Sequence, residues 1–192
     1  MTAPRGGRAG GGAPNRVRII AGTHRSRVIR FPESKGLRPT PDRVRETLFN
    51  WLGQDLSGLA CLDLFAGSGA LGFEAASRHA RSVVLLERDA VAVRALRDNA
   101  RLLGLPAVEV VAGDALEFLR FDKRRFDVVF VDPPYEGSDH SGVLSKLVDH
   151  LAPGARVYLE GPRRLEPGGG WSVLRHLAAG KVHAHLIQVP DT

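Results

Sequence analysis

The sequence predicts an α/β protein with a mostly parallel, doubly wound sheet that ends in an antiparallel hairpin. Three observations predict this fold class. Short apolar runs alternate with helical patterns between residues 59 and 160, as expected for a parallel sheet covered by helices on both faces. A glycine-rich turn follows the first apolar run. Two strand patterns, at 171–177 and 182–189, close the chain around the turn Ala179-Gly180.

The main domain is predicted over residues 54–192. Its parallel strands are expected at the apolar runs 59–65, 82–86, 108–112, 126–131 and 156–160. Helices are expected between them, at 71–78, 90–103, 115–120 and 140–151. Gly104 follows the longest of these helices and is a typical helix stop.

The chain ahead of this domain divides into two parts. Residues 1–15 are rich in Gly, Pro and Arg and lack apolar periodicity, so we expect them to be disordered. Residues 16–31 predict a β-hairpin, because apolar and polar residues alternate on either side of a turn at 22–26. A helix follows, with Thr40 as its expected N-cap, Pro41 as its first residue and Gly53 as its stop. Residues 16–53 therefore form a predicted N-terminal extension.

Length and composition restrict the class of protein. A chain of 192 residues suffices for one domain with a substantial core. No apolar run approaches the roughly 20 residues of a membrane span, and no secretory signal pattern opens the chain, so no membrane partner is expected. Cys61 is the single cysteine, which fits a reducing, cytoplasmic compartment. The histidines lack metal-ligand spacing, so no metal is expected, and His183 and His185 are predicted to lie on an exposed strand face.

The positive charge is concentrated at the N-terminal end. Residues 1–50 carry a net charge of +8 and the remaining residues a net charge of −2, within a total of +6. A basic arm on a near-neutral body favours a polyanionic partner such as a nucleic acid. A solvated tail that improves solubility is the alternative interpretation.

A cofactor site is predicted at the first strand-to-helix junction. Gly67-Ser68-Gly69-Ala70-Leu71-Gly72 fits the pattern G-x-G-x-x-G, in which glycines permit a tight turn and close approach of a ligand to the backbone. Asp63, Glu87 and Asp114 follow three successive strands. Glu87 comes 20 residues after Gly67, where a carboxylate accepts hydrogen bonds from ribose hydroxyls. The simpler interpretation is that these acids cap helices.

Two nucleoside cofactors fit this pattern. A dinucleotide would place its pyrophosphate at the N-terminus of the following helix. S-adenosyl-L-methionine has no phosphate but carries an ammonium and a sulfonium group, which suit Asp63, whereas that carboxylate opposes a pyrophosphate. Asp114 would then contact the adenine amine. The acidic strand ends therefore favour S-adenosyl-L-methionine.

A second motif, Asp132-Pro133-Pro134-Tyr135, follows the fourth predicted strand. Ligands of open α/β sheets bind outside the carboxyl ends of the strands. The Asp132 carboxylate and the Pro133 carbonyl are two acceptors at one point, and together they can hold both hydrogens of an –NH2 group. This alignment directs the nitrogen lone pair at an electrophilic methyl group. Tyr135 is placed to stack on a base that has left its helix, and a helix-capping aspartate in a proline-rich loop is the alternative.

The two motifs and their spacing resemble the class I S-adenosylmethionine-dependent amino methyltransferases and imply their Rossmann-like fold. The N-terminal extension narrows this resemblance. Three blocks of the extension look like those of the bacterial 16S rRNA (guanine-966-N2) methyltransferase family. They are Arg18-Ile19-Ile20-Ala21-Gly22, Arg38-Pro39-Thr40 and the helix residues Arg43-Val44-Arg45-Glu46-Thr47-Leu48-Phe49-Asn50. The resemblance runs from about Arg16 to Val189. It departs from the family at Pro41, where a second threonine is expected, and in the glycine-rich tail.

The resemblance implies a monomeric enzyme that methylates N2 of one guanine in 16S rRNA, within the small ribosomal subunit or its assembly intermediate. It implies that S-adenosyl-L-methionine is bound by Asp63, Phe65, Gly67, Gly69, Glu87 and Asp114. It also implies that the guanine amine is held by Asp132, Pro133, Pro134 and Tyr135. Phosphate contacts to the rRNA are expected from Arg16, Arg18, Arg25, Arg27, Arg38 and Arg43.

Other functions fit part of the pattern. A DNA adenine-N6 methyltransferase would use the same amine chemistry, although no separate target-recognition domain is visible in 192 residues. A protein glutamine methyltransferase would more often carry Asn at position 132, and a nicotinamide dehydrogenase leaves Asp63 and the Asp-Pro-Pro-Tyr motif unexplained. A non-catalytic assembly factor that binds rRNA through its basic arm is the alternative outside the enzymes.

Overall fold

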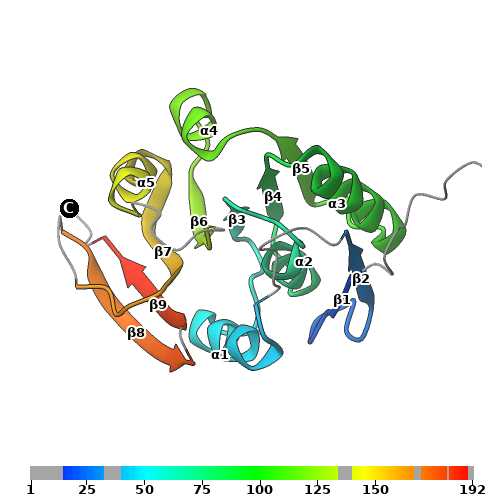
Figure 1. Cartoon of the computed structure of the whole chain (residues 1–192), viewed down its shortest axis with the longest axis horizontal. Coiled ribbons are helices and arrows are strands. Elements are labelled where there is room, and N and C mark those ends of the chain that lie inside the picture. Colours follow the sequence, from blue (N-terminus) through cyan, green and yellow to red (C-terminus); the bar gives the residue numbers. More distant parts are fainter. Residues whose placement is uncertain (1–14, 33–39, 134–139, 167–169, 181, 190–192) are drawn as a thin grey trace, which may run out of the picture.

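The fold is organised around a seven-stranded sheet with the strand order β5-β4-β3-β6-β7-β9-β8 (Figure 1). The structure is a computed structural model that describes residues 15–32, 40–133, 140–166, 170–180 and 182–189. The strands are β3 (Ala60–Asp63), β4 (Ser82–Glu87), β5 (Val108–Ala112), β6 (Phe126–Val131), β7 (Leu151–Gly161), β8 (Ser172–Ala179) and β9 (Val182–Gln188). Strands β3 to β7 are parallel, and β9 pairs antiparallel with both β7 and β8. This confirms the predicted parallel sheet with a C-terminal antiparallel hairpin.

Helices cover both faces of this sheet, as the near-continuous apolar strands require. They are α1 (Asp42–Leu52), α2 (Ala70–Ser77), α3 (Ala90–Leu103), α4 (Ala115–Phe121) and α5 (His140–Leu147). The helix predicted over 140–151 is shorter than expected, because a 3-10 turn at Val148–His150 leads directly into β7. Among the described residues, no helix is long and apolar enough to cross a membrane.

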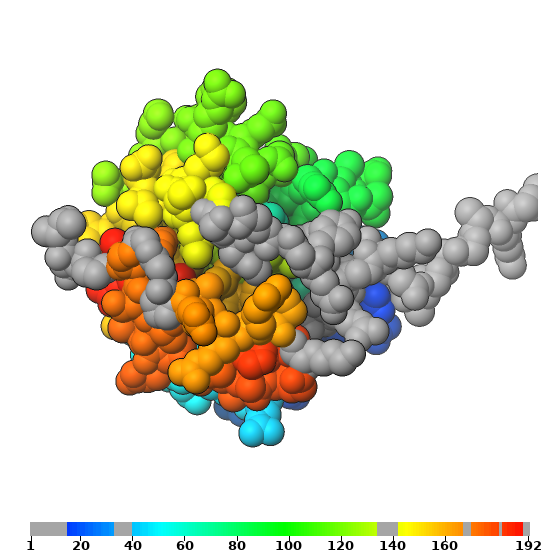
Figure 2. All heavy atoms as spheres, turned by 60° about the vertical axis from the view of Figure 1, so that its left-hand side comes forward, coloured from blue at the N-terminus to red at the C-terminus, as the bar shows by residue number. Residues whose placement is uncertain are grey.

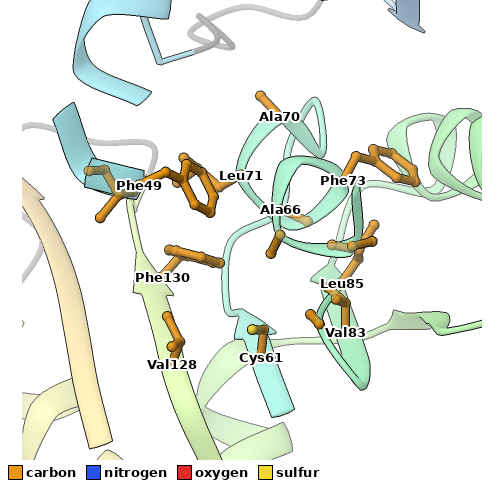
Figure 3. Packing of buried hydrophobic residues seen from close by; sticks show 14 of the residues in the cluster. Phe49, Cys61, Ala66, Ala70, Leu71, Phe73, Val83, Leu85, Val128 and Phe130 are labelled. Atoms are coloured by element: carbon orange, nitrogen blue, oxygen red, sulfur yellow. The ribbon is translucent and has the colours of Figure 1, made fainter. Parts of the chain in front are cut away.

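One face of the sheet packs against α1 and α2 (Figure 3). Phe49 of α1 lies against Phe130 of β6, with ring centroids 6.0 Å apart. Cys61 of β3 is completely buried in the same layer. On the other face, α4 and α5 cover a second apolar cluster through Leu119, Leu144 and Leu147. Figure 2 shows the C-terminal strands (orange and red) on the surface below α5 (yellow).

The predicted hairpin of the N-terminal extension forms a separate two-stranded antiparallel sheet of β1 (Asn15–Arg18) and β2 (Val28–Phe31). Val17, Ile29 and Phe31 are buried in the same cluster as α1 and α2. Asn99 of α3 holds the β2 backbone, since its amide donates to the Arg30 carbonyl at 2.7 Å and accepts from the Arg30 N–H at 3.2 Å. The extension therefore shares its core with the main domain.

A buried ion cluster fixes the connection between β1 and β2 onto α2. The completely buried Glu74 accepts hydrogen bonds from the backbone N–H groups of Ile20 at 2.7 Å and Ala21 at 3.0 Å. It also pairs with Arg78 at 2.8 Å and with the fully buried Arg45 at 3.5 Å. Buried charges are stable only when they are paired and hydrogen-bonded, so this cluster specifies where the connection lies.

Two local predictions are wrong. Thr40 does not cap α1, because Pro41 takes the N-cap position with an extended ψ of 146° and no side-chain cap; the Thr40 hydroxyl instead hydrogen-bonds Glu160. His185 is not exposed but 1% accessible. Its ring accepts a hydrogen bond from the Leu165 N–H at 2.9 Å, which a strand pattern alone does not reveal.

Candidate active site

The chain reverses direction across the sheet between β3 and β6, and the candidate site lies at this switch. From β3 the chain moves outward to β4 and β5, and it then returns to place β6 on the other side of β3. Open α/β sheets bind ligands at such a switch point, outside the carboxyl ends of the strands. The glycine turn follows β3, and Asp132 follows β6.

An acidic residue stands at the carboxyl end of each of the five parallel strands. Across the sheet these residues follow the order Asp114, Glu87, Asp63, Asp132 and Glu160. The first four were predicted as site residues, and the structure brings them to one edge. Glu160 was not predicted, because only the pairing of β7 with β6 places it beside Asp132.

The glycine turn has the backbone that the sequence motif requires. Gly67 has φ of 51° and Gly69, the residue before α2, has φ of 79°, conformations that glycine adopts without strain. A Cβ on Gly72 would lie 2.0 Å from the Leu85 side chain, so this glycine permits close packing of α2 on β4. Phe65, the predicted cofactor contact next to the turn, is partly buried against the second core cluster.

Glu87 and Asp114 already bind backbone N–H groups. Glu87 accepts from Gly67 at 2.9 Å and from Asp89 at 2.8 Å, so it links the end of β4 to the glycine turn. Asp114 caps α4 through Oδ1, which accepts from Leu116 and Glu117. The capping interpretation is therefore confirmed for Asp114, and its contact with adenine stays a prediction. The hydrogen bond between Gly67 and Glu87 holds the acid that is predicted to bind ribose against the glycine turn.

Asp63 is a buried carboxyl group, and its ionised form is therefore destabilised. Its side chain is 2% exposed and accepts a hydrogen bond from the Gly72 N–H at 3.1 Å. The pKa of Asp63 is raised to about 7, mainly by burial and in part by the nearby Glu87, although the hydrogen bonds from the backbone of Gly72 and Phe65 act to lower it. A bound cation would offset this cost, so the site fits the ammonium group of S-adenosyl-L-methionine better than it fits a phosphate.

Asp132 lies on the other side of Asp63, next to Glu160. Burial raises the pKa of Asp132 well above its ordinary value, and Glu160 and Asp63 raise it further. Pro133 follows as a partly exposed residue. Pro134 and Tyr135 lie outside the described residues, so their predicted roles stay predictions. A carboxylate whose pKa is raised in this way is suited to accept a proton from a substrate.

Glu160 is held by two hydroxyl groups. The Tyr158 hydroxyl donates to Glu160 Oε1 at 2.5 Å, and the Thr40 hydroxyl forms a second bond. Burial raises the pKa of Glu160, and both bonds lower it. Through Thr40, the N-terminal extension reaches the candidate site directly. No local sequence pattern indicates the contact with Thr40, because it joins the residue ahead of α1 to the end of β7.

The arginines predicted to bind RNA are exposed where the structure describes them. They are Arg16, Arg18, Arg25, Arg27 and Arg43, and Arg38 lies outside the described residues. Arg18 pairs with Asp42 at 3.7 Å, and both side chains are at least half exposed. All five belong to the N-terminal extension, which agrees with the concentration of positive charge at this end of the sequence.

The chain is similar to known rRNA methyltransferases. It is 41% identical over 179 residues to the ribosomal RNA small subunit methyltransferase D of Escherichia coli, a match that covers 90% of this chain and 89% of that protein. A solved structure of the Escherichia coli methyltransferase named yhhF has a TM-score of 0.83 and 38% identity, covering 91% of this chain and 98% of that chain.

Wider comparisons agree on the fold. An RNA methyltransferase from Salinibacter ruber, solved in complex with S-adenosyl-L-homocysteine, has a TM-score of 0.63 at 24% identity, covering 81% of this chain and 95% of that chain. This likeness supports the class I methyltransferase fold. The family model described as conserved hypothetical protein 95 matches residues 17–188. The chain therefore belongs to this family, together with the small subunit rRNA methyltransferases that it resembles over nine-tenths of its length.

Proposed function

We propose that this protein transfers a methyl group from S-adenosyl-L-methionine to N2 of guanine 966 of 16S rRNA in the small ribosomal subunit. The observation that carries the proposal is the row of acids at the carboxyl ends of the strands, in which Asp132 lies near Asp63, the acid predicted to hold the cationic part of the cofactor. The 41% identity to the methyltransferase from Escherichia coli supports the choice of rRNA. We further propose that the protein acts as a monomer and that it works in the cytoplasm, where its substrate, the small ribosomal subunit, is found.

The residues proposed to bind the cofactor lie on or just after β3, β4 and β5, on one side of Asp132. Asp63 would hold the ammonium group, Glu87 the ribose hydroxyls and Asp114 the adenine amine, while Gly67 and Gly69 leave the turn open to the ligand. When bound, S-adenosyl-L-methionine supplies an electrophilic methyl group. Because Asp63 is buried, water is excluded from the carboxylate that would bind the ammonium group of the cofactor.

The amine half of the site consists of Asp132 and the Pro133 carbonyl. An exocyclic amine is a poor nucleophile because its lone pair is delocalised into the base. Two acceptors fix the two N–H bonds and so turn the lone pair toward the methyl group. As positive charge develops on the nitrogen, Asp132 takes one of its protons, and the raised pKa of Asp132 favours this transfer.

The arginine side chains of the extension would bind rRNA phosphates. Such contacts position the particle and do not read its sequence. They predict a strong dependence of substrate binding on salt concentration, because each neutralised phosphate releases counterions.

Replacement of Asp132 with alanine tests the proposal. We expect the Asp132→Ala variant to lose methyl transfer to small-subunit particles, measured with labelled S-adenosyl-L-methionine, and to retain cofactor affinity within a few-fold by calorimetry. Asp98→Ala is the matched control, because Asp98 is an exposed aspartate on α3. A full rate for Asp132→Ala would refute the role of Asp132. Absence of cofactor binding to the unmodified protein would favour a non-catalytic assembly factor.

A further inference from the structure

Glu160 is the one acidic strand end that the proposed reaction leaves without a role. Asp114, Glu87 and Asp63 belong to the cofactor half, and Asp132 belongs to the amine half. The pairing of Val131 with Leu159 in parallel register places Asp132 and Glu160 side by side at the next position. Neighbouring strands lie ~4.8 Å apart, and paired residues point to the same face, so the two carboxyl groups are close neighbours.

The strand order determines on which side of Asp132 the base must lie. The predicted cofactor contacts are all on β3, β4 and β5 or just after them, on one side of β6. A methyl group therefore reaches the amine from the β3 side. The ring that carries the amine then extends toward β7, and Glu160 is the charged residue at the end of that strand.

The Glu160 side chain is fixed as a hydrogen-bond acceptor. Tyr158 donates to Oε1 at 2.5 Å, and Thr40 forms the second hydroxyl bond. A carboxylate offers about four acceptor positions, so two remain for another donor. Glu160 keeps 9% of its surface accessible, at the edge of the sheet where Asp132 and Pro133 are partly exposed.

The base edges differ in what they offer to such an acceptor. Beside its N2 amine, guanine carries an N1–H donor. Adenine carries an unprotonated N1 beside its N6 amine, and this nitrogen lone pair would face the carboxylate. Enzymes that extrude a base read it by hydrogen bonds to this edge, and a site with a buried acceptor strongly disfavours a ligand that lacks the matching donor.

We propose that Glu160 is a specificity-determining residue that accepts the guanine N1–H, while Asp132 and the Pro133 carbonyl hold the N2 amine. This inference rests on the proposed function and deepens it. The acceptors then match the donors along the guanine edge in order: Glu160 for N1–H, and Asp132 and Pro133 for the two amine hydrogens. The local residues thereby distinguish guanine from adenine, which the Asp-Pro-Pro-Tyr motif alone does not do.

A substrate with an altered base provides the test. Small-subunit particles are reconstituted with 16S rRNA that carries either guanine or 2-aminopurine at the target position. 2-Aminopurine keeps the exocyclic amine at C2 but has an unprotonated N1. The ratio of kcat/KM for guanine over 2-aminopurine is measured for the unmodified protein, for Glu160→Gln, and for Glu166→Gln as a control at an exposed glutamate outside the site.

We expect the unmodified protein and Glu166→Gln to prefer guanine by more than tenfold. In Glu160→Gln the amide can donate to N1 of 2-aminopurine, so the preference should fall at least tenfold or reverse, with cofactor affinity unchanged. If Glu160→Gln does not fold, Glu160→Asp serves instead, and its rate should fall more on guanine than on 2-aminopurine.

Two results overturn the inference. An unchanged guanine preference in the Glu160 variant shows that Glu160 does not read the base. An equal loss of kcat on both bases, with a shifted pH profile, shows that Glu160 acts only by positioning or tuning Asp132. Failure of the unmodified protein to methylate guanine is a different outcome, because it refutes the proposed function itself.

Discussion

Replacement of Asp63 with asparagine tests two effects of its buried charge: the loss of unfolding free energy that the charge causes, and the binding of the cofactor that it is proposed to provide. Asp63 has a pKa of about 7 in the folded protein, compared with an ordinary value of 3.8. The folded protein therefore keeps this proton between pH 3.8 and 7, while the unfolded chain releases it. Since the unfolded state binds fewer protons in this window, the unfolding free energy falls as pH rises through it. The whole difference corresponds to at most about 4 kcal/mol.

Asparagine has no charge to bury, so the Asp63→Asn variant avoids this loss. The unfolding free energy of Asp63→Asn relative to the unmodified protein should rise by up to about 1.4 kcal/mol per pH unit from pH 5 to 7 and be level above that. A misaligned amide hydrogen bond to Gly72 or Phe65 would shift the curve by a constant and leave its slope unchanged. Affinity for S-adenosyl-L-methionine should fall at least tenfold at pH 8, because the ammonium group loses its counter-charge.

Urea denaturation from pH 5 to 8, followed by the fluorescence of Trp51 and Trp171, measures the stability difference. Asp98→Asn is the control, because the side chain of Asp98 is 64% exposed, and its difference curve should be flat. A flat curve for Asp63→Asn would refute the argument that the Asp63 charge is buried at a cost. Full cofactor affinity in that variant would refute the assignment of Asp63 to the ammonium group.

Two further predictions concern the attachment of the N-terminal extension. Glu74→Gln leaves two buried arginines without their shared counter-charge and should lower the unfolding free energy by about 3–5 kcal/mol in urea at pH 7; a loss below about 1 kcal/mol would contradict this. Gly22 has φ of 81°, and a Cβ there would lie 1.9 Å from the Ser77 carbonyl oxygen, so Gly22→Ala should speed tryptic cleavage of the hairpin connection while cofactor binding persists. Gly104→Ala, with φ of 62° and open space around it, is the control, and equal cleavage rates in the two variants would show that the connection does not need its close contact with α2.

The sequence was sufficient to predict the elements whose pattern is local. Helix α3 and strands β5 and β6 have the predicted bounds, because apolar periodicity and turn residues act over a few neighbours. Asp63, Glu87 and Asp132 were recognised as strand-end acids for the same reason. A position at the carboxyl end of a parallel strand follows from the strand prediction itself.

Contacts between distant elements could not be predicted. The burial of His185 depends on the pairing of β9 with β7 and β8. The bond between Thr40 and Glu160 depends on where α1 begins relative to β7. Glu160 has the same local pattern as any glutamate at the end of an apolar strand, and its place beside Asp132 follows only from the order of the strands.

Identification of the modified nucleoside decides whether this protein methylates a guanine amine of rRNA. Small-subunit particles that lack the modification, naked 16S rRNA and DNA would each be incubated with the protein and labelled S-adenosyl-L-methionine, then digested to nucleosides. We expect label in N2-methylguanosine from rRNA, and the comparison of particles with naked rRNA identifies the preferred substrate. Label in N6-methyladenine from DNA would contradict this expectation.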